Sequence, residues 1–285
     1  MRLPFFLAKR FVAAESLGET LPVAAALHRK GLRVTLDQLG EYISDPELAT
    51  SSRDAYIELI RDLANSAEGI DCNISIKMSM LGQKIDESFC LDNLHQLLCV
   101  AKENDAFVRL DMEGSDVTES TLSIFERVHP EYPNNVGIVL QAYLRRTSED
   151  VTRMCELNAR VRICKGAYKE PASVAYQNMN DIRDRFIEQT ETLISRGRYP
   201  GIATHDDILI RQTKEFVRAN DIPAEKFEFQ MLYGIRPNTQ ISIASEGYNM
   251  RVYIPFGPMW LPYFSRRLRE RKENVFFVLM NMFRR

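Results

Sequence analysis

Eight short runs of apolar and β-branched residues recur along the chain, separated by longer stretches in which apolar and polar positions mix. Runs of this length and composition, bounded by polar or turn-forming residues, are typical of β-strands. The predicted strands are residues 32–37, 73–79, 107–113, 136–143, 160–168, 201–206, 227–234 and 251–257. The sequence therefore predicts strands along most of the chain rather than in one part of it.

The stretches between these strands have helical periodicity. In "DAYIELIRDLANSAEG" (54–69) and "DDILIRQTKEFVRAN" (206–220), apolar residues fall at spacings of three and four, as in a helix with one buried face. A strand followed by a helix, repeated eight times, is the pattern of a (β/α)₈ barrel. We therefore expect an α/β fold of this TIM-like type, with extra helices before the first strand.

A doubly wound open sheet shares the same alternation of strands and helices. It usually carries phosphate-binding glycines after its first strand, where this chain reads "LDQLGEYISD" (36–45). No GxGxxG motif occurs there or elsewhere in the sequence. The barrel is therefore the better interpretation of the pattern.

No Gly/Ser-rich linker, low-complexity tract or shift in composition divides the chain. We expect one domain over residues 1–285, with a helical segment at 1–30 and a C-terminal helix at 272–285. The apolar stretch "NVFFVLMNMFRR" in that last helix is shorter than the roughly 20 residues that span a bilayer. Packing against the domain is the expected role of this helix, and docking on a membrane surface is the alternative.

Composition limits the classes of partner. The formal net charge is −2, which argues against binding to nucleic acid, because such proteins usually display an excess of basic residues. The five cysteines are scattered and contain no CxxC, so we expect reduced thiols and a cytoplasmic protein. The four histidines do not cluster with carboxylates along the chain, and we expect no metal.

Polar side chains gather near the carboxyl ends of the predicted strands, the end at which barrel enzymes build their active sites. They are Asp37, Lys77, Asp111, Gln141, Arg162, Lys165, His205, Gln230 and Tyr253. One alone could be structural, for example as an ion pair of Asp111 with Arg109. Because buried charge is costly unless it is paired or bound, the whole set indicates a site for a polar, partly anionic ligand.

A second group of cations follows the last strand, in "YFSRRLRE" (263–270). Arg266 and Arg267 are adjacent, and Glu270 lies at a helical spacing that lets it pair with either one. With Tyr253, Trp260 and Tyr263 nearby, this group could hold a small carboxylate that has an apolar body, or it could form a solvated basic face.

Two kinds of chemistry fit a site at the carboxyl ends of the strands, which we call the mouth of the barrel. Lys77 or Lys165 could form a Schiff base, as in aldolase-type barrels, if burial lowers the lysine pKa. Alternatively, the cations could stabilise a reduced flavin, with Gln141 bonding its ring. A barrel that only binds an amino acid is a third possibility, and spacing alone does not decide among them.

Seven blocks, in order, resemble the signature blocks of the proline dehydrogenase family. They are "SIKMS", "RLDME", "VLQAYL", "VRICKGAY", "IATHD", "FEFQMLYG" and "YIPFGPMWLPYFSRRLRE". The resemblance covers nearly the whole chain from the first strand onward. It implies a distorted (β/α)₈ barrel that binds FAD and oxidises L-proline to Δ1-pyrroline-5-carboxylate, the first step of proline catabolism, by hydride transfer from C5 to flavin N5.

The same resemblance implies partners. Electrons would pass to a quinone, which gives the C-terminal helix a possible peripheral contact with the inner face of the membrane. The chain is similar to the short, monofunctional form, so the product would go to a separate pyrroline-5-carboxylate dehydrogenase. It departs from the large bifunctional members in two places, because Lys169 replaces an aromatic residue and the link to the arginine pair is shorter.

Position by position, the resemblance assigns roles to individual residues. Asp111 would be the catalytic carboxylate, and Arg162 would lie against flavin N5. The substrate would contact Lys77, Tyr168, Tyr253, Arg266 and Arg267, with Glu270 orienting the arginine pair. FAD would contact Met112, Gln141, Arg162, Lys165, Gly166, Ala167, Thr204 and His205.

Two questions stay open at this point. The group that takes the proton from the proline amine could be Lys77, Asp111 or water. Cys164 could be a thiolate activated by Arg162, although a small residue in the core is the simpler interpretation.

Overall fold

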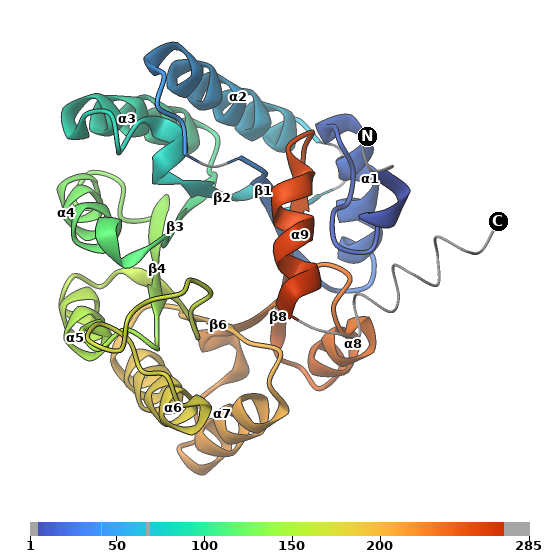
Figure 1. Cartoon of the computed structure of the whole chain (residues 1–285). Coiled ribbons are helices and arrows are strands. Elements are labelled where there is room, and N and C mark those ends of the chain that lie inside the picture. The colour runs from blue at the N-terminus through green and yellow to red at the C-terminus, as the bar shows by residue number, and fades with distance from the viewer. Residues whose placement is uncertain (1–4, 41, 67–68, 271–285) are drawn as a thin grey trace.

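The computed structural model describes residues 5–40, 42–66 and 69–270, with side chains up to residue 265. Eight parallel strands close into a barrel in chain order, and Figure 1 shows this barrel with the helices around it. They are β1 (Arg33–Gln38), β2 (Asn73–Lys77), β3 (Phe107–Asp111), β4 (Val136–Gln141), β5 (Arg160–Cys164), β6 (Gly201–Ala203), β7 (Glu228–Leu232) and β8 (Asn249–Phe256). Each lies within or over a predicted strand, so the barrel prediction is confirmed.

Helices surround the barrel in the described part of the chain (Figure 1). They are α1 (Leu17–His28), α2 (Pro46–Ala64), α3 (Glu87–Glu103), α4 (Thr118–Val128), α5 (Thr147–Glu156), α6 (Met179–Arg196), α7 (Asp207–Ala219), α8 (Pro237–Ser245) and α9 (Trp260–Glu270). Side chains cap several of them: Asp45 begins α2 and Asp206 begins α7, each accepting a bond from a backbone N–H of the first turn.

The segment predicted as helical at 1–30 contains α1. Among the described residues, only Phe5–Leu7 form a short 3₁₀ helix before α1. Phe11 and Val12 instead pack against Trp260 and Phe264 of α9, in a hydrophobic cluster separate from the main core. The N-terminal segment therefore supports α9, the helix that follows the last strand.

The barrel interior is unusually charged. Layers of branched apolar side chains fill most barrels of this kind, whereas here Arg109, Arg251 and Glu228 are almost fully buried inside. Arg251 Nε donates to Glu228 Oε1 at 2.8 Å, so these two charges compensate each other. The apolar core lies between the strands and the surrounding helices.

In the described part of the chain, no helix is long and apolar enough to cross a membrane. The predicted C-terminal helix at 272–285 lies outside the described residues.

Candidate active site

Arg162 is the centre of a buried polar cluster at the carboxyl end of the barrel. Its Nη1 donates to Asp111 Oδ1 at 2.8 Å, and its Nη2 donates to Ser75 Oγ at 3.1 Å. Its Nε donates to Gln230 Oε1 at 2.5 Å. Because these partners come from β2, β3 and β7, none of which neighbours β5, the contacts must cross the barrel interior.

Each carboxylate oxygen of Asp111 accepts a hydrogen bond. Tyr253 of β8 donates its hydroxyl to Asp111 Oδ2 at 2.7 Å, while Arg162 occupies the other oxygen. Burial raises the pKa of Asp111 above its usual value, even though the charges of Arg162 and Lys77 act in the opposite direction. The alternative pairing with Arg109 is wrong: Arg109 donates to backbone carbonyls, that of Ile138 among them.

Lys77 ends β2 and lies beside Asp111 in the strand register. Its Nζ donates to Asp37 Oδ1 at 2.9 Å, and both side chains are buried. Burial alone would lower the pKa of Lys77, but the charges of Asp37 and Asp111 outweigh it, and the pKa is raised. A Schiff-base lysine needs a lowered pKa, so the structure argues against that chemistry at Lys77.

The residues assigned to FAD lie around one arc of this rim. Met112 and Gln141 follow or end β3 and β4, Lys165, Gly166 and Ala167 follow β5, and Thr204 and His205 follow β6. Gln141 Nε2 donates to the Met112 carbonyl at 3.4 Å, but its buried Oε1 has no hydrogen-bond partner among the described residues. A buried amide oxygen without a partner suits a ligand that brings a donor, such as a flavin ring N–H.

His205 has a defined tautomer, because the Leu232 N–H donates to its Nε2 at 3.0 Å. The ring proton of neutral His205 is therefore on Nδ1.

Lys165 joins a cationic cluster that sequence reasoning did not find. Lys165 Nζ and Arg183 Nε both reach Asp206 Oδ2, at 2.5 and 2.8 Å. Burial would raise the pKa of Asp206, but the bonds from these two cations help to lower it to about 2. Two cations that share one carboxylate leave an excess positive charge, which suits an anionic part of a ligand.

Gly166 has a structural reason that the sequence did not reveal. Its φ is +114°, and a Cβ at this position would lie 2.2 Å from Cδ1 of Tyr143. The expected reason was close approach of the backbone to a cofactor. The structure shows that the missing side chain first makes room for the Tyr143 ring.

Replacing Gly166 by alanine should lower the free energy of unfolding by about 1–3 kcal/mol, because backbone strain and a clash with the Tyr143 ring coincide. Chemical denaturation of the purified protein measures this effect. Gly31→Ala is the matched control, since Gly31 also has a positive φ (+77°) but no atom within 4 Å of the added Cβ. Equal losses in both variants would mean that the Tyr143 contact is unimportant.

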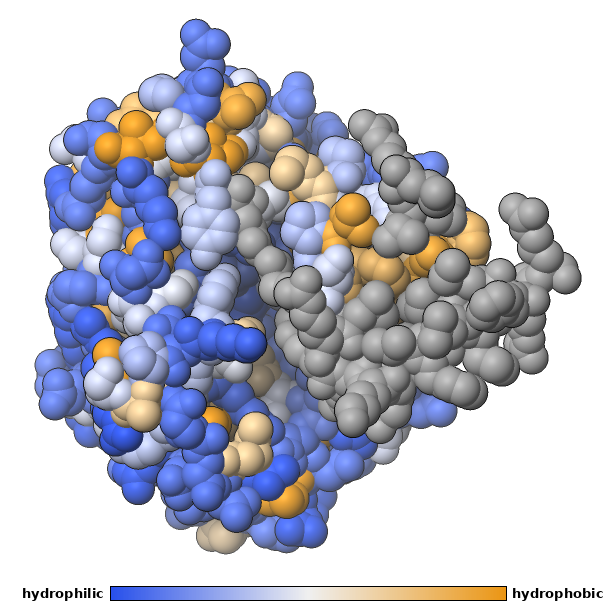
Figure 2. Space-filling model, viewed as in Figure 1, coloured by the Kyte–Doolittle hydropathy of each residue, from blue (hydrophilic) through white to orange (hydrophobic). Residues whose placement is uncertain are grey.

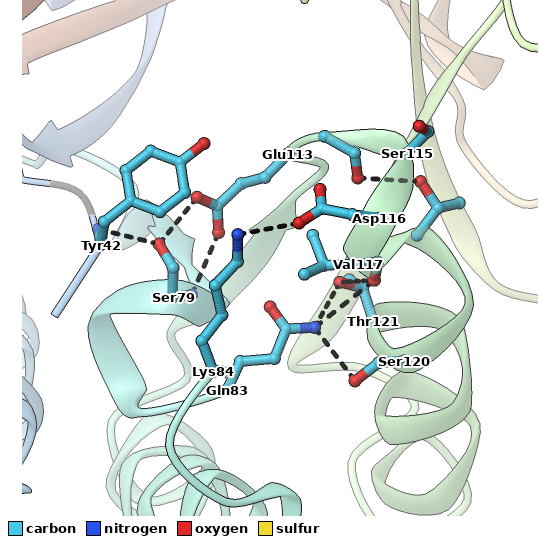
Figure 3. Close-up of polar contacts among 12 residues, drawn as sticks. Tyr42, Ser79, Gln83, Lys84, Glu113, Ser115, Asp116, Val117, Ser120 and Thr121 are labelled. Atoms are coloured by element: carbon cyan, nitrogen blue, oxygen red, sulfur yellow. Dashed lines mark hydrogen bonds and ion pairs between the residues drawn. The ribbon is translucent and has the colours of Figure 1, made fainter. Parts of the chain in front are cut away.

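Loops at this end of the barrel are tied together by a separate polar network, shown in Figure 3. Glu113 accepts from both the N–H and the hydroxyl of Ser79, at 3.0 and 2.7 Å. Lys84 Nζ donates to Asp116 Oδ2 at 2.8 Å and lies 4.8 Å from the centre of the Tyr42 ring. These contacts join the loops after β1, β2 and β3, so Glu113 serves the scaffold around the mouth.

The surface on this side of the molecule is hollowed near its centre and largely hydrophilic over its left part (Figure 2). The backbone of α9 continues to Glu270, so Arg266, Arg267 and Glu270 share one helix as expected. Their side chains lie outside the described residues. Tyr168 lies in the loop after β5.

The structure also bears on a reactive thiol and on metal binding. Burial raises the pKa of the Cys164 thiol to about 11, so it is protonated at neutral pH, in agreement with a packing role. Within the described ranges, no three His, Cys, Asp or Glu side chains are placed to hold a metal ion.

Comparison with known proteins identifies the family. The proline dehydrogenase family model matches residues 20–279. Proline dehydrogenase of Deinococcus radiodurans is 41% identical over 280 residues, which cover 97% of this chain and 90% of that protein. Proline dehydrogenase 1 of Bacillus subtilis (strain 168) is 39% identical over 278 residues, covering 98% of this chain and 91% of that protein. The chain belongs to the proline dehydrogenase family.

Proline dehydrogenases are oxidoreductases, so this chain is an enzyme of proline metabolism. The solved structure of proline utilization A from Bdellovibrio bacteriovorus has a TM-score of 0.86 and 29% identity. It matches 93% of this chain, which spans only 32% of that longer protein. The proline dehydrogenase barrel of this chain therefore corresponds to one part of the larger protein.

Proposed function

We propose that this proline dehydrogenase family member binds FAD and oxidises L-proline to Δ1-pyrroline-5-carboxylate. The observation that carries the proposal is the buried cluster of Arg162, Asp111 and Tyr253 beside the Lys77–Asp37 pair. Gln141 ends β4, between the strands that carry Asp111 and Arg162, and its Oε1 has no hydrogen-bond partner among the described residues.

One arc of the rim would hold the flavin. The residues are Met112, Gln141, Arg162, Lys165, Gly166, Ala167, Thr204 and His205. When bound, FAD supplies an acceptor for the hydride that leaves C5 of proline. The chain's own contribution is electrostatic: Arg162 is held by three neighbours, so its fixed positive charge stabilises negative charge that develops beside it.

Residues at or after the ends of β2, β5 and β8 would hold proline beside the flavin. Lys77, Tyr168 and Tyr253 would surround the ring, and Arg266 and Arg267 would bind the carboxylate, with Glu270 orienting them. The proline nitrogen must be neutral when the hydride leaves. Because Asp37 keeps Lys77 protonated, Lys77 is a poor proton acceptor, which leaves Asp111 and water.

Replacing Arg266 or Arg267 by methionine should raise the KM for proline about tenfold or more, because each change removes a charge-assisted bond worth about 1.5–3 kcal/mol. Steady-state kinetics over a wide range of proline concentration measure this effect. Arg269→Met is the control on the same helix. Unchanged KM values in both Arg266→Met and Arg267→Met would place the carboxylate elsewhere.

Anaerobic titration of the purified protein with L-proline tests the proposal directly. The expected result is a flavin absorption spectrum that bleaches on addition of proline. A folded protein that takes up no FAD would contradict it. Trapping of a carbonyl compound on Lys77 or Lys165 by borohydride would instead support the lysine Schiff-base lyase.

The electron acceptor is proposed to be a membrane quinone, reached from the cytoplasm by peripheral contact. The product would pass to a separate pyrroline-5-carboxylate dehydrogenase. Deleting residues 272–285 should lower vesicle binding and quinone turnover if the C-terminal helix docks on the membrane. Equal binding and turnover in the shortened protein would exclude that role for the segment.

A further inference from the structure

A chain of buried polar groups runs through the barrel interior beneath Arg162. Arg251 Nε donates to Glu228 Oε1 at 2.8 Å, and Gln230 Nε2 donates to the same oxygen at 2.5 Å. Gln230 Oε1 then accepts from Arg162 Nε at 2.5 Å. All four residues are between 1% and 5% exposed, so no solvent competes for these bonds.

The Glu228 carboxylate determines the orientation of the Gln230 amide. Burial would raise the pKa of Glu228, but the charge of Arg251 and bonds to both neighbours lower it to about 2. Glu228 is therefore ionised and can only accept hydrogen bonds. The NH₂ of Gln230 must face it, which leaves the carbonyl oxygen for Arg162.

Arg251 and Glu228, at the end of this series of polar groups farthest from Arg162, have further hydrogen-bond partners. Arg251 Nη1 donates to Asp71 Oδ2 at 2.7 Å, and Tyr199 donates its hydroxyl to the second oxygen of Glu228 at 3.2 Å. Neither Arg251 nor Glu228 reaches the mouth of the barrel. In the described part of the chain, Gln230 hydrogen-bonds both Glu228 and Arg162 and so links this pair to the site.

Gly201 of β6 provides the space in which the amide lies. A Cβ at Gly201 would be 2.5 Å from Nε2 and 2.9 Å from Cδ of Gln230. The space beside Gly201 and the bonds to Glu228 and Arg162 therefore favour the same position of the Gln230 side chain. This close fit is independent of the hydrogen bonds, and it also restricts the Gln230 amide to one position.

We infer that Gln230 is a positioning residue, which holds the guanidinium of Arg162 in place through the Arg251–Glu228 pair and thereby tunes the bound flavin. The inference rests on the proposed function, because it needs Arg162 beside the flavin. Asp111 and Ser75 bind the two terminal nitrogens of Arg162, and Gln230 is the partner of Nε among the described residues. Without that third bond, the guanidinium is free to turn toward Asp111.

The test is Gln230→Leu, assayed in the flavin-loaded full-length protein. The midpoint potential of the flavin is expected to become more negative, and the rate of its anaerobic reduction by proline is expected to fall about tenfold. The dissociation constant for proline should change less than about twofold, because the Gln230 amide bonds Arg162 and Glu228, neither of which is a proposed substrate residue. This combination distinguishes tuning of the flavin from a general loss of structure.

Gln240→Leu is the matched control. Gln240 is also buried, but its amide donates to the carbonyls of Leu232 and Ile235, away from Arg162. It should lose stability without a change in the flavin potential. If Gln230→Leu does not fold, Gly201→Ala replaces it, since the added methyl group displaces the amide and should shift potential and rate in the same direction.

A folded variant with the potential and reduction rate of the unaltered protein would overturn the inference. Failure of the proposed function looks different, because the unaltered protein would then bind no flavin or show no bleaching with proline.

Discussion

Replacing Arg162 by methionine is expected to lower the rate of flavin reduction by proline about a hundredfold or more, the largest kinetic effect expected for this site. The guanidinium donates to Asp111, Ser75 and Gln230 at once. Methionine keeps much of the side-chain length but removes the charge and all three bonds. Stopped-flow absorption under anaerobic conditions measures the loss, and FAD content is determined for the same sample.

A distant arginine is the control for this experiment. Arg198 lies between α6 and β6, where its guanidinium donates to the Pro133 carbonyl at 2.9 Å and to Asn134 at 2.6 Å. This position precedes β6 and belongs to the end of the barrel away from the mouth. Arg198→Met should therefore keep the reduction rate. A similar loss in both variants would show that Arg162 acts on stability rather than on the flavin.

The fold could be predicted because the signal for each strand and each helix lies in residues that are close together in the sequence. Each strand is a short apolar run and each helix has its own period, so alternation along the chain is enough to indicate a barrel. The rim could be predicted for the same reason, since Lys77, Asp111 and Gln141 are the last residues of their strands. A position along a strand does not require knowledge of what lies opposite.

Pairings across the barrel could not be predicted in this way. The sequence indicates Asp37 only as a polar strand end, and its bond to Lys77 joins residues 40 apart in sequence. The sequence offers Arg109, two residues away, as a partner of Asp111, whereas the actual partner is Arg162, 51 residues on. Closure of the sheet decides these contacts, and spacing along one strand carries no information about it.

The charged interior was missed for a different reason. Arg109 and Arg251 stand within apolar strands, two residues before Asp111 and Tyr253 respectively. Side chains at i and i+2 face the same side of a strand, so these arginines also point into the barrel. The sequence therefore contains the signal for these two buried arginines, one inward-facing position before the polar residues near the strand ends.

Replacing Lys77 by methionine should lower the free energy of unfolding by about 3–5 kcal/mol, because it leaves the Asp37 carboxylate buried without its cation. Asp37 is 1% exposed, and its Oδ1 lies 2.9 Å from Lys77 Nζ. The same variant should also raise the KM for proline, since Lys77 is proposed to contact the substrate. Urea unfolding and steady-state kinetics report these two losses separately.

The double variant Lys77→Met with Asp37→Asn separates the causes of these losses. Asparagine removes the unpaired buried charge, so most of the lost stability should return. The proline KM should stay high, because the cation is still absent from the mouth. Recovery of both quantities would mean that Lys77 only neutralises Asp37, and recovery of neither would mean that the pair is not the source of the instability.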